Sequence, residues 1–201
     1  MITLLLADDQ ALVRGAMAAL LGFEEDLEVV AEVGTGDEVL QAARRTRPDV
    51  AVLDIEMPGM DGIAATAQLA RELPGTRILI VTTFGRPGYL RRALEAGASG
   101  FVVKDTPSEE LAEAVRTVAR GGRVVDPSLA TESVVGGPNP LTNREREVLT
   151  HALDGGSAAA IGARVHLSPG TVRNHLSSAI GKTGSSTRVE AARRAQDLGW
   201  L

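Results

Sequence analysis

The first 120 residues alternate short aliphatic runs with segments of helical periodicity, and this alternation restricts the fold more than any other feature. Turn residues separate the runs from the helical segments. Five strand–helix repeats predict an α/β domain with a five-stranded, doubly wound parallel sheet and helices on both faces. The predicted strands are Ile2–Ala7, Leu27–Val33, Val50–Leu53, Ile78–Thr82 and Phe101–Val103. The predicted helices are Gln10–Leu21, Asp37–Arg47, Ile63–Leu73, Pro87–Ala96 and Ser108–Arg120.

Acidic residues stand where two of these runs end. Asp8 and Asp9 follow the first run, and Asp54 follows the third. Parallel strands bring their carboxyl ends to one edge of the sheet, which is where open α/β sheets bind ligands. Carboxylates at such close range repel one another, and a hard cation such as Mg²⁺ relieves the repulsion. The pattern predicts a magnesium-dependent phosphoryl site with Asp54 as the acceptor, although each acid alone is explained equally well as a helix cap.

Charge is distributed unevenly along the chain. Residues 1–120 carry a net charge of −7 and residues 140–201 carry +3, which indicates two modules, the second with a polyanionic partner. The absence of cysteine excludes disulfides and cysteine-based metal sites. The first apolar run has six residues, too few for a signal peptide or a membrane span. We therefore expect a cytoplasmic protein without membrane insertion.

The glycine- and proline-rich composition of residues 121–139 predicts a linker between two domains, residues 1–120 and residues 140–201. The second domain reads as a small all-α unit. A capping box is predicted from Thr142 and Glu145, and a helix start is predicted at Ser168, which precedes Pro169. The expected helices are Thr142–Leu153, Ser157–Val165, Ser168–Ile180 and Thr187–Leu198.

Several motifs occur together in the front domain, at characteristic spacing. They are Asp8-Asp9, Asp54 within Leu53–Gly62, Thr82, and the segment Gly97–Lys104, in which Phe101 lies 19 residues after Thr82. With this set the domain resembles the receiver domain of two-component response regulators. The resemblance implies a flavodoxin-like sheet with the strand order 2-1-3-4-5.

The resemblance also implies a role for each acid. Asp54 would be the nucleophile that takes a phosphoryl group from a phosphohistidine on a sensor histidine kinase. Asp8 and Asp9 would bind Mg²⁺ together with Asp54 and the backbone carbonyl of Glu56. The chain would catalyse only its own phosphorylation and dephosphorylation, and would not be a conventional enzyme.

Three further residues would respond to the phosphoryl group. Lys104 would place a positive charge on its oxygens. Thr82 would donate its hydroxyl to the attached phosphate, and Phe101 would fill the space that Thr82 leaves. These movements together would form a two-state switch. Asp105 follows Lys104, where many receivers have a proline.

The tail is similar to LuxR-type helix-turn-helix domains, through Leu141–Leu149 and Leu167–Leu176. The whole chain therefore resembles the NarL/FixJ group of regulators. The implied recognition helix starts at Ser168 and enters the major groove of double-stranded DNA. Its proposed DNA-contacting residues are Thr171, Arg173, Asn174, His175 and Lys182, with Arg173 and Asn174 on base edges and Thr171 and Lys182 on phosphates. The alternative is a solvated polar helix face.

Three features of the sequence refine this expectation. Ala158–Ala160 lacks the charged residues that the family usually carries there, and Gly181 weakens a helix interior. We therefore expect a DNA-binding domain that is less stable, or binds DNA more weakly, than the family average. The segment Thr82–Tyr89 is similar to the subgroup of regulators paired with membrane-fluidity-sensing kinases.

These observations predict a phosphorylation-activated transcriptional regulator that forms a homodimer on phosphorylation and binds paired half-sites. The alanine-rich helices Gln10–Leu21 and Ser108–Arg120 are the expected dimer interface. Two alternatives stay open at this point. One is a DNA-binding regulator that does not depend on phosphate. The other is a Mg²⁺ phosphatase with an aspartyl nucleophile on the first strand. Such an enzyme would usually carry a second acid two residues after that nucleophile, a spacing that Ala7–Gln10 lacks.

Overall fold

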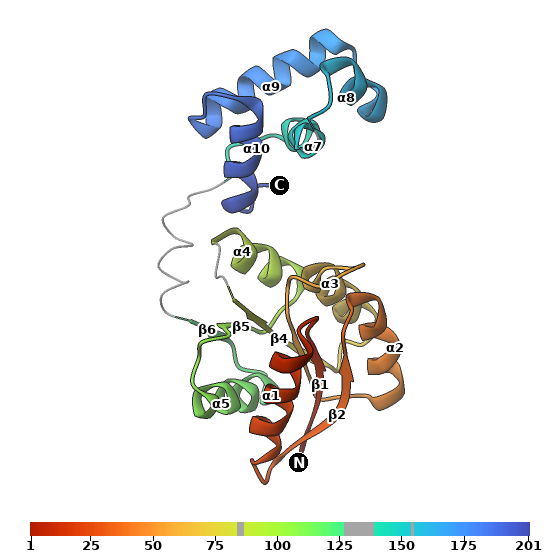
Figure 1. The fold of residues 1–201 in the computed structure, drawn as a ribbon, viewed down its shortest axis with the longest axis vertical. Coiled ribbons are helices and arrows are strands. Elements are labelled where there is room, and N and C mark those ends of the chain that lie inside the picture. The colour runs from red at the N-terminus through yellow and green to blue at the C-terminus, as the bar shows by residue number, and fades with distance from the viewer. Residues whose placement is uncertain (84–86, 127–138, 154) are drawn as a thin grey trace. The chain divides into compact units, whose positions relative to one another are not determined.

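The computed structural model describes residues 1–83, 87–126, 139–153 and 155–201. Backbone contacts divide the chain into two compact units (Figure 1). The first comprises Met1–Gly85 and Tyr89–Thr131, and the second Arg86–Gly88 and Glu132–Leu201. Part of the segment that resembles the subgroup noted above, residues 84–86, and most of the predicted linker, residues 127–138, lie outside the described residues.

The first unit is built on a parallel sheet with the order β2-β1-β3-β4-β5-β6 (Figure 1). The predicted order of the five main strands is confirmed. The sixth strand has two residues and pairs with β5, although these residues fall within the predicted linker. The strands are β1 Ile2–Ala7, β2 Leu27–Val33, β3 Val50–Leu53, β4 Arg77–Thr82, β5 Gly100–Val103 and β6 Val124–Val125.

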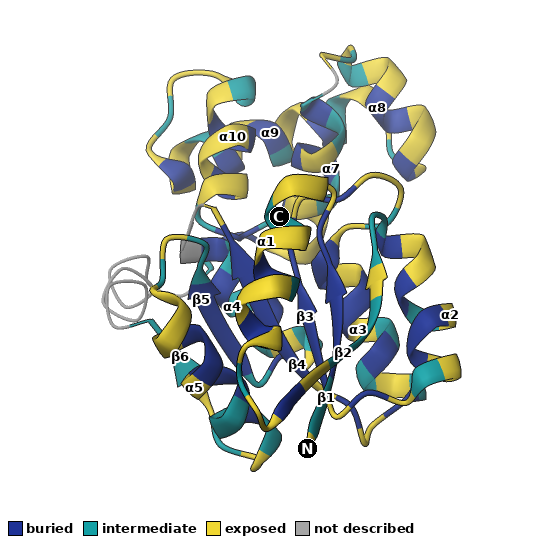
Figure 2. Cartoon of the chain, turned by 60° about the horizontal axis from the view of Figure 1, so that its bottom comes forward, coloured by how far each residue is buried: buried dark blue, intermediate teal, exposed yellow. Residues whose placement is uncertain are grey.

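Helices cover both faces of this sheet, because alternate residues of the central strands point into two separate cores (Figure 2). On one face Leu5 and Leu53 pack with α2, α3 and α4, and on the other Leu6 and Val52 pack with α1 and α5. Both cores are largely aliphatic, as the scarcity of aromatic residues requires. The helices are α1 Ala11–Gly22, α2 Gly36–Thr46, α3 Gly62–Glu72, α4 Pro87–Ala96 and α5 Ser108–Ala119.

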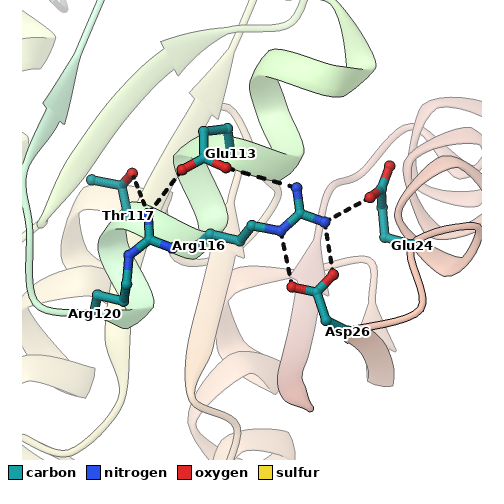
Figure 3. Close-up of polar contacts among 6 residues, drawn as sticks. All are labelled: Glu24, Asp26, Glu113, Arg116, Thr117 and Arg120. Carbon is teal, nitrogen blue, oxygen red and sulfur yellow. Dashed lines mark hydrogen bonds and ion pairs between the residues drawn. The ribbon is translucent and has the colours of Figure 1, made fainter.

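An ion cluster ties α5 to the segment between α1 and β2 (Figure 3). The Arg116 guanidinium donates to both oxygens of Asp26, at 2.9 and 2.7 Å, and to Glu24 at 2.6 Å. The hydrogen bond from Arg116 lowers the pKa of Asp26. Arg120 donates to Glu113 at 2.8 Å on the same helix. The contacts are exposed and individually weak, but together they fix α5 beside the end of α1.

The second unit contains four helices among the described residues: α7 Asn143–Ala152, α8 Ala158–Val165, α9 Pro169–Thr183 and α10 Arg188–Asp197. Their apolar faces enclose a core of small and aliphatic side chains together with Trp200. The predicted capping box at Thr142 is present, and Ser168 caps α9 with Pro169 at its first position. The expected four-helix unit is confirmed.

Gly181 lies inside α9, and a Cβ added there would meet nothing within 4 Å. Gly181→Ala should therefore raise the free energy of unfolding of the second unit by about 0.5–1 kcal/mol, because alanine loses less backbone entropy in a helix. The measurement is chemical denaturation of the full chain, followed by the fluorescence of Trp200, the single tryptophan. Gly184→Ala is the control and should destabilise the unit, because Gly184 has φ +61°. Equal or lower stability of Gly181→Ala would contradict the expectation.

Candidate functional site

Three carboxylates meet at the carboxyl edge of the first unit's sheet. Ala7 of β1 is in register with Leu53 of β3, so the next residues, Asp8 and Asp54, leave the sheet side by side. The Asp54 amide donates to the Ala7 carbonyl at 2.8 Å and continues the ladder by one bond. One oxygen from each of Asp8, Asp9 and Asp54 lies within 4.8 Å of the others. The strand pairing thus concentrates negative charge at one point.

Lys104, which follows β5, provides the positive charge in this pocket. Its Nζ lies 2.7 Å from Asp8 Oδ2 and 2.8 Å from Asp54 Oδ2, and its side chain is only 8% exposed. The Lys104 amide donates to the Thr82 carbonyl at 2.8 Å, which fixes the backbone position of the lysine. No peptide bond in the described residues is cis, so the bond between Lys104 and Asp105 is trans.

Burial and charge act against each other on these groups. Burial raises the pKa of Asp54, and the hydrogen bond from Lys104 only partly offsets that effect. Burial also opposes the charge on Lys104, but its contacts with the carboxylates of Asp54 and Asp8 outweigh this, so its pKa is raised. Lys104 therefore remains an ammonium group, and a carboxylate at Asp54 is stabilised by a cation beside it.

The pocket fits a hard divalent cation. The Asp8 side chain is fully buried, and although Asp8 Oδ2 makes an ion pair with Lys104, it has no hydrogen-bond partner of good geometry. Asp9 is exposed and faces the solvent side of the cluster, and Glu56 is exposed two residues after Asp54. The side chains gathered here offer only oxygen ligands, which suit hard divalent cations. The acidic pocket is consistent with divalent metal binding.

The two predicted switch residues belong to neighbouring strands. Thr82 ends β4, is 1% exposed and is in register with Val103 of β5. Phe101 lies in β5 opposite Ile80 and is fully buried in the core that α2, α3 and α4 share. Thr82 is therefore at the same sheet edge as the acids, and Phe101 is one layer deeper in the same pair of strands.

Two residues that sequence reasoning did not select also shape the pocket. A Cβ on Gly62 would lie 1.9 Å from the Asp54 carbonyl oxygen, so α3 can begin this close to Asp54 only with glycine. Arg14 of α1 donates from Nη1 to the Asp8 carbonyl at 2.5 Å. Gly62 is part of the segment after Asp54 and could have been flagged as a helix start. Arg14 gives no such signal, because its role depends on the packing of α1 against the sheet.

In the second unit, α8 and α9 form the helix-turn-helix. Arg173 and Asn174 are exposed near the start of α9, and Thr171 and His175 are half-buried beside them. The Thr171 hydroxyl shares a 2.8 Å hydrogen bond with the Ser168 hydroxyl. Lys182 lies near the other end of α9, and its Nζ is 2.8 Å from the carboxylate of Glu145 on α7. The first four residues are therefore grouped, whereas Lys182 is engaged elsewhere in the unit.

Known protein families match both units. Residues 4–116 match the response regulator receiver domain, and residues 139–195 match the bacterial regulatory proteins of the luxR family. The transcriptional regulatory protein DesR of Bacillus subtilis is 42% identical, with both chains fully covered. The transcriptional regulatory protein UhpA of Escherichia coli is 40% identical over the full length of both chains. The chain belongs to the NarL/FixJ family of response regulators.

Solved structures agree with this assignment. The response regulator ChrA of a heme-sensing two-component system is 33% identical and has a TM-score of 0.60, with 100% of this chain and 98% of ChrA covered. The regulator RcsB in complex with DNA covers 98% of both chains with a TM-score of 0.72, and at 22% identity it supports the fold alone. This response regulator is a phosphorylation-activated, DNA-binding transcriptional regulator and not a conventional enzyme. Among the described residues, no helix is long and apolar enough to cross a membrane.

Lys104 compensates the acids of this regulator, so its loss should matter most without a divalent cation. Lys104→Met should lower the free energy of unfolding by about 2–3 kcal/mol in EDTA, because it leaves buried carboxylates uncompensated. Saturating Mg²⁺ should recover at least half of that loss, because binding to the folded state stabilises it. The measurement is denaturation of both proteins with and without Mg²⁺, and Arg120→Met is the control for charge removal at the surface. A loss that Mg²⁺ does not change would contradict this role.

Proposed function

We propose that Asp54 accepts a phosphoryl group from a phosphohistidine of a sensor histidine kinase and that the modified chain dimerises on paired half-sites of double-stranded DNA. The observation that supports this most strongly is the arrangement of Asp8, Asp9 and Asp54 around Lys104 at one edge of the sheet. We assign residues 1–120 to the phosphoacceptor domain, residues 121–139 to the linker and residues 140–201 to the DNA-binding domain.

In the transfer step, a carboxylate oxygen of Asp54 attacks phosphorus and forms the O–P bond of an acyl phosphate. The N–P bond to the histidine breaks, and its electron pair stays on the imidazole of the kinase. Lys104 already contacts the Asp54 oxygen at 2.8 Å and can bind an oxygen of the arriving phosphoryl group. Asp8, Asp9 and Asp54, with the backbone carbonyl of Glu56, would hold Mg²⁺, which when bound offsets the charge of the phosphoryl group.

The switch that follows would use Thr82 and Phe101. The Thr82 hydroxyl donates to an oxygen of the new phosphate, which draws the end of β4 toward Asp54. Phe101 lies beside that strand in the buried core, so its ring can take up the space that opens. A close-packed core favours two discrete arrangements over continuous deformation. Phosphorylation would thereby alter the surface of the receiver domain.

Helices α1 and α5 supply the face that we assign to the dimer. The exposed large apolar residues among those described include Leu12, Leu20 and Phe23, all on α1 or at its end, and Leu12 is 87% exposed. The contacts of Arg116 hold α5 beside this region. An apolar strip on one helix is suited to pairing with the same strip on a second copy. Linking two DNA-binding domains in this way raises their combined avidity.

In the DNA-binding domain, the start of α9 would enter the major groove. Arg173 and Asn174 would contact base edges, and Thr171 a phosphate, with His175 beside them. Two domains in a dimer would engage half-sites about one helical turn, roughly 10 base pairs, apart. Because the donor kinase and DNA must both reach the chain, we place it in the cytoplasm.

Asp54→Asn should abolish the phosphoryl adduct. After incubation with acetyl phosphate and Mg²⁺, intact-mass spectrometry of the wild type should show one addition of about 80 Da, and the variant none, because an amide cannot form the acyl phosphate. Asp9→Asn should form the adduct about tenfold more slowly, and the exposed Glu110→Gln at the wild-type rate. An adduct on Asp54→Asn would assign the acceptor to another residue. Many turnovers of donor by the wild type would favour a phosphatase.

Ala16→Glu should weaken phosphorylation-dependent dimerisation by about tenfold or more, because it places a charge within the apolar strip of α1. Analytical ultracentrifugation with and without phosphodonor measures the dimer dissociation constant. Ala67→Glu is the matched control, since Ala67 is equally exposed but lies on α3 on the other side of the sheet. Equal dissociation constants for the two variants would exclude α1 from the interface.

A further inference from the structure

The carboxylate of Glu145 connects α7 to the recognition helix α9. Glu145 is 3% exposed, although it belongs to the first turn of a helix. Its Oε2 accepts from the Thr142 amide at 2.7 Å, which completes the capping box. Its other contacts come from α9, where the Ser178 hydroxyl donates to Oε1 at 2.6 Å and Lys182 Nζ lies 3.0 and 2.8 Å from the two oxygens. One side chain thus both caps α7 and holds two positions of α9.

The hydrogen bonds keep this buried carboxylate ionised. Burial alone would raise its pKa, but the bonds from Lys182, Ser178 and Thr142 hold the pKa of Glu145 at about 2. A buried carboxylate that loses its cationic partner becomes strongly unfavourable. Lys182 could therefore turn toward DNA only by leaving Glu145 uncompensated.

The cations of α9 are few. Arg173 and Lys182 are the only lysine or arginine residues in its sequence. The Lys182 side chain is 34% exposed, so its position alone is compatible with a phosphate contact. Its ammonium, however, already contacts both oxygens of the buried Glu145 carboxylate, so its charge is already paired within the unit. Arg173, near the start of the helix, is exposed, whereas the ammonium of Lys182 is paired with Glu145.

We propose that Lys182 is a positioning residue, which fixes the recognition helix on α7 through Glu145 and does not contact DNA phosphate. This replaces the phosphate role expected for Lys182 from the sequence, and it rests on the proposed DNA binding through α9. The pair sets the orientation of α9, so DNA affinity depends on it although neither side chain touches DNA.

Neutralising Glu145 distinguishes the two possible roles of Lys182, because each role predicts a different change in DNA affinity. Glu145→Gln leaves Lys182 without its anionic partner. If Lys182 contacts phosphate, this release should leave DNA affinity unchanged or increase it. If Lys182 positions α9, affinity should fall about fivefold or more. The matched control is Glu147→Gln, which removes the same charge from α7 but only breaks an exposed pair with Arg144. Its affinity should stay within about twofold of the wild type.

The salt dependence of Lys182→Met gives a second readout. Each phosphate contact contributes about one unit to the slope of log affinity against log salt concentration, and loss of a contact removes that unit. We expect Lys182→Met to lose affinity about fivefold or more with an unchanged slope. A slope reduced by about one unit, or an increased affinity of Glu145→Gln, would overturn the proposal.

The probe is a DNA duplex selected from a random pool by the full wild-type chain with acetyl phosphate and Mg²⁺. If that selection yields no specific duplex, the proposed DNA recognition fails, whereas the role of Lys182 fails only by the outcomes above. Trp200 lies in the core of the same unit, so its fluorescence shows whether each variant is folded at the assay temperature.

If either charge variant unfolds, Ser178→Ala replaces it, because this change removes one hydrogen bond to Glu145 and keeps every charge. It should lower affinity about twofold or more with an unchanged slope, and an unchanged affinity would overturn the proposal.

Discussion

Repulsion among carboxylates at the end of two adjacent strands is the constraint on which the front half of this molecule depends. Parallel pairing of β1 with β3 places Asp8 and Asp54 side by side, and Asp9 follows directly. Such a cluster is stable only with positive charge beside it, which Lys104 supplies from the end of β5. A divalent cation or a phosphoryl group that enters this pocket changes the balance of charge that the surrounding strand ends must satisfy. The pocket is therefore a natural place for a switch.

The second unit also contains a buried carboxylate, but its charge is compensated in a different way. Glu145 is about as buried as Asp8 and Asp54, but its hydrogen-bond partners all belong to its own unit. It has no open side for a ligand, so its ionisation contributes to structure and not to signalling. The contrast matches the two roles that we propose, a phosphoryl acceptor for Asp54 and a support for the recognition helix for Glu145.

Much of this organisation could be predicted from the sequence, because periodic patterns report local structure directly. Alternation of aliphatic runs and helical segments predicted the parallel sheet and the position of Asp54 at a strand end, and the resemblance to receiver domains implied the strand order. The two-residue strand β6 was not foreseen, since two valines within a linker composition carry no period. The role of Arg14 and the contacts of Glu145 with α9 were also missed. Both depend on packing between helices and distant segments, and Lys182 is 37 residues from Glu145.

Phosphorylation of the first unit is proposed to control DNA binding by the second. Measuring DNA affinity as a function of phosphoryl content tests this most directly. Full-length protein would be brought to graded occupancy with acetyl phosphate and Mg²⁺, quantified by intact mass, and titrated with a selected DNA duplex. The account predicts that affinity rises tenfold or more as occupancy approaches one phosphoryl group per chain. Affinity that stays the same from zero to full occupancy would show that DNA binding does not depend on the pocket, and would contradict the central claim.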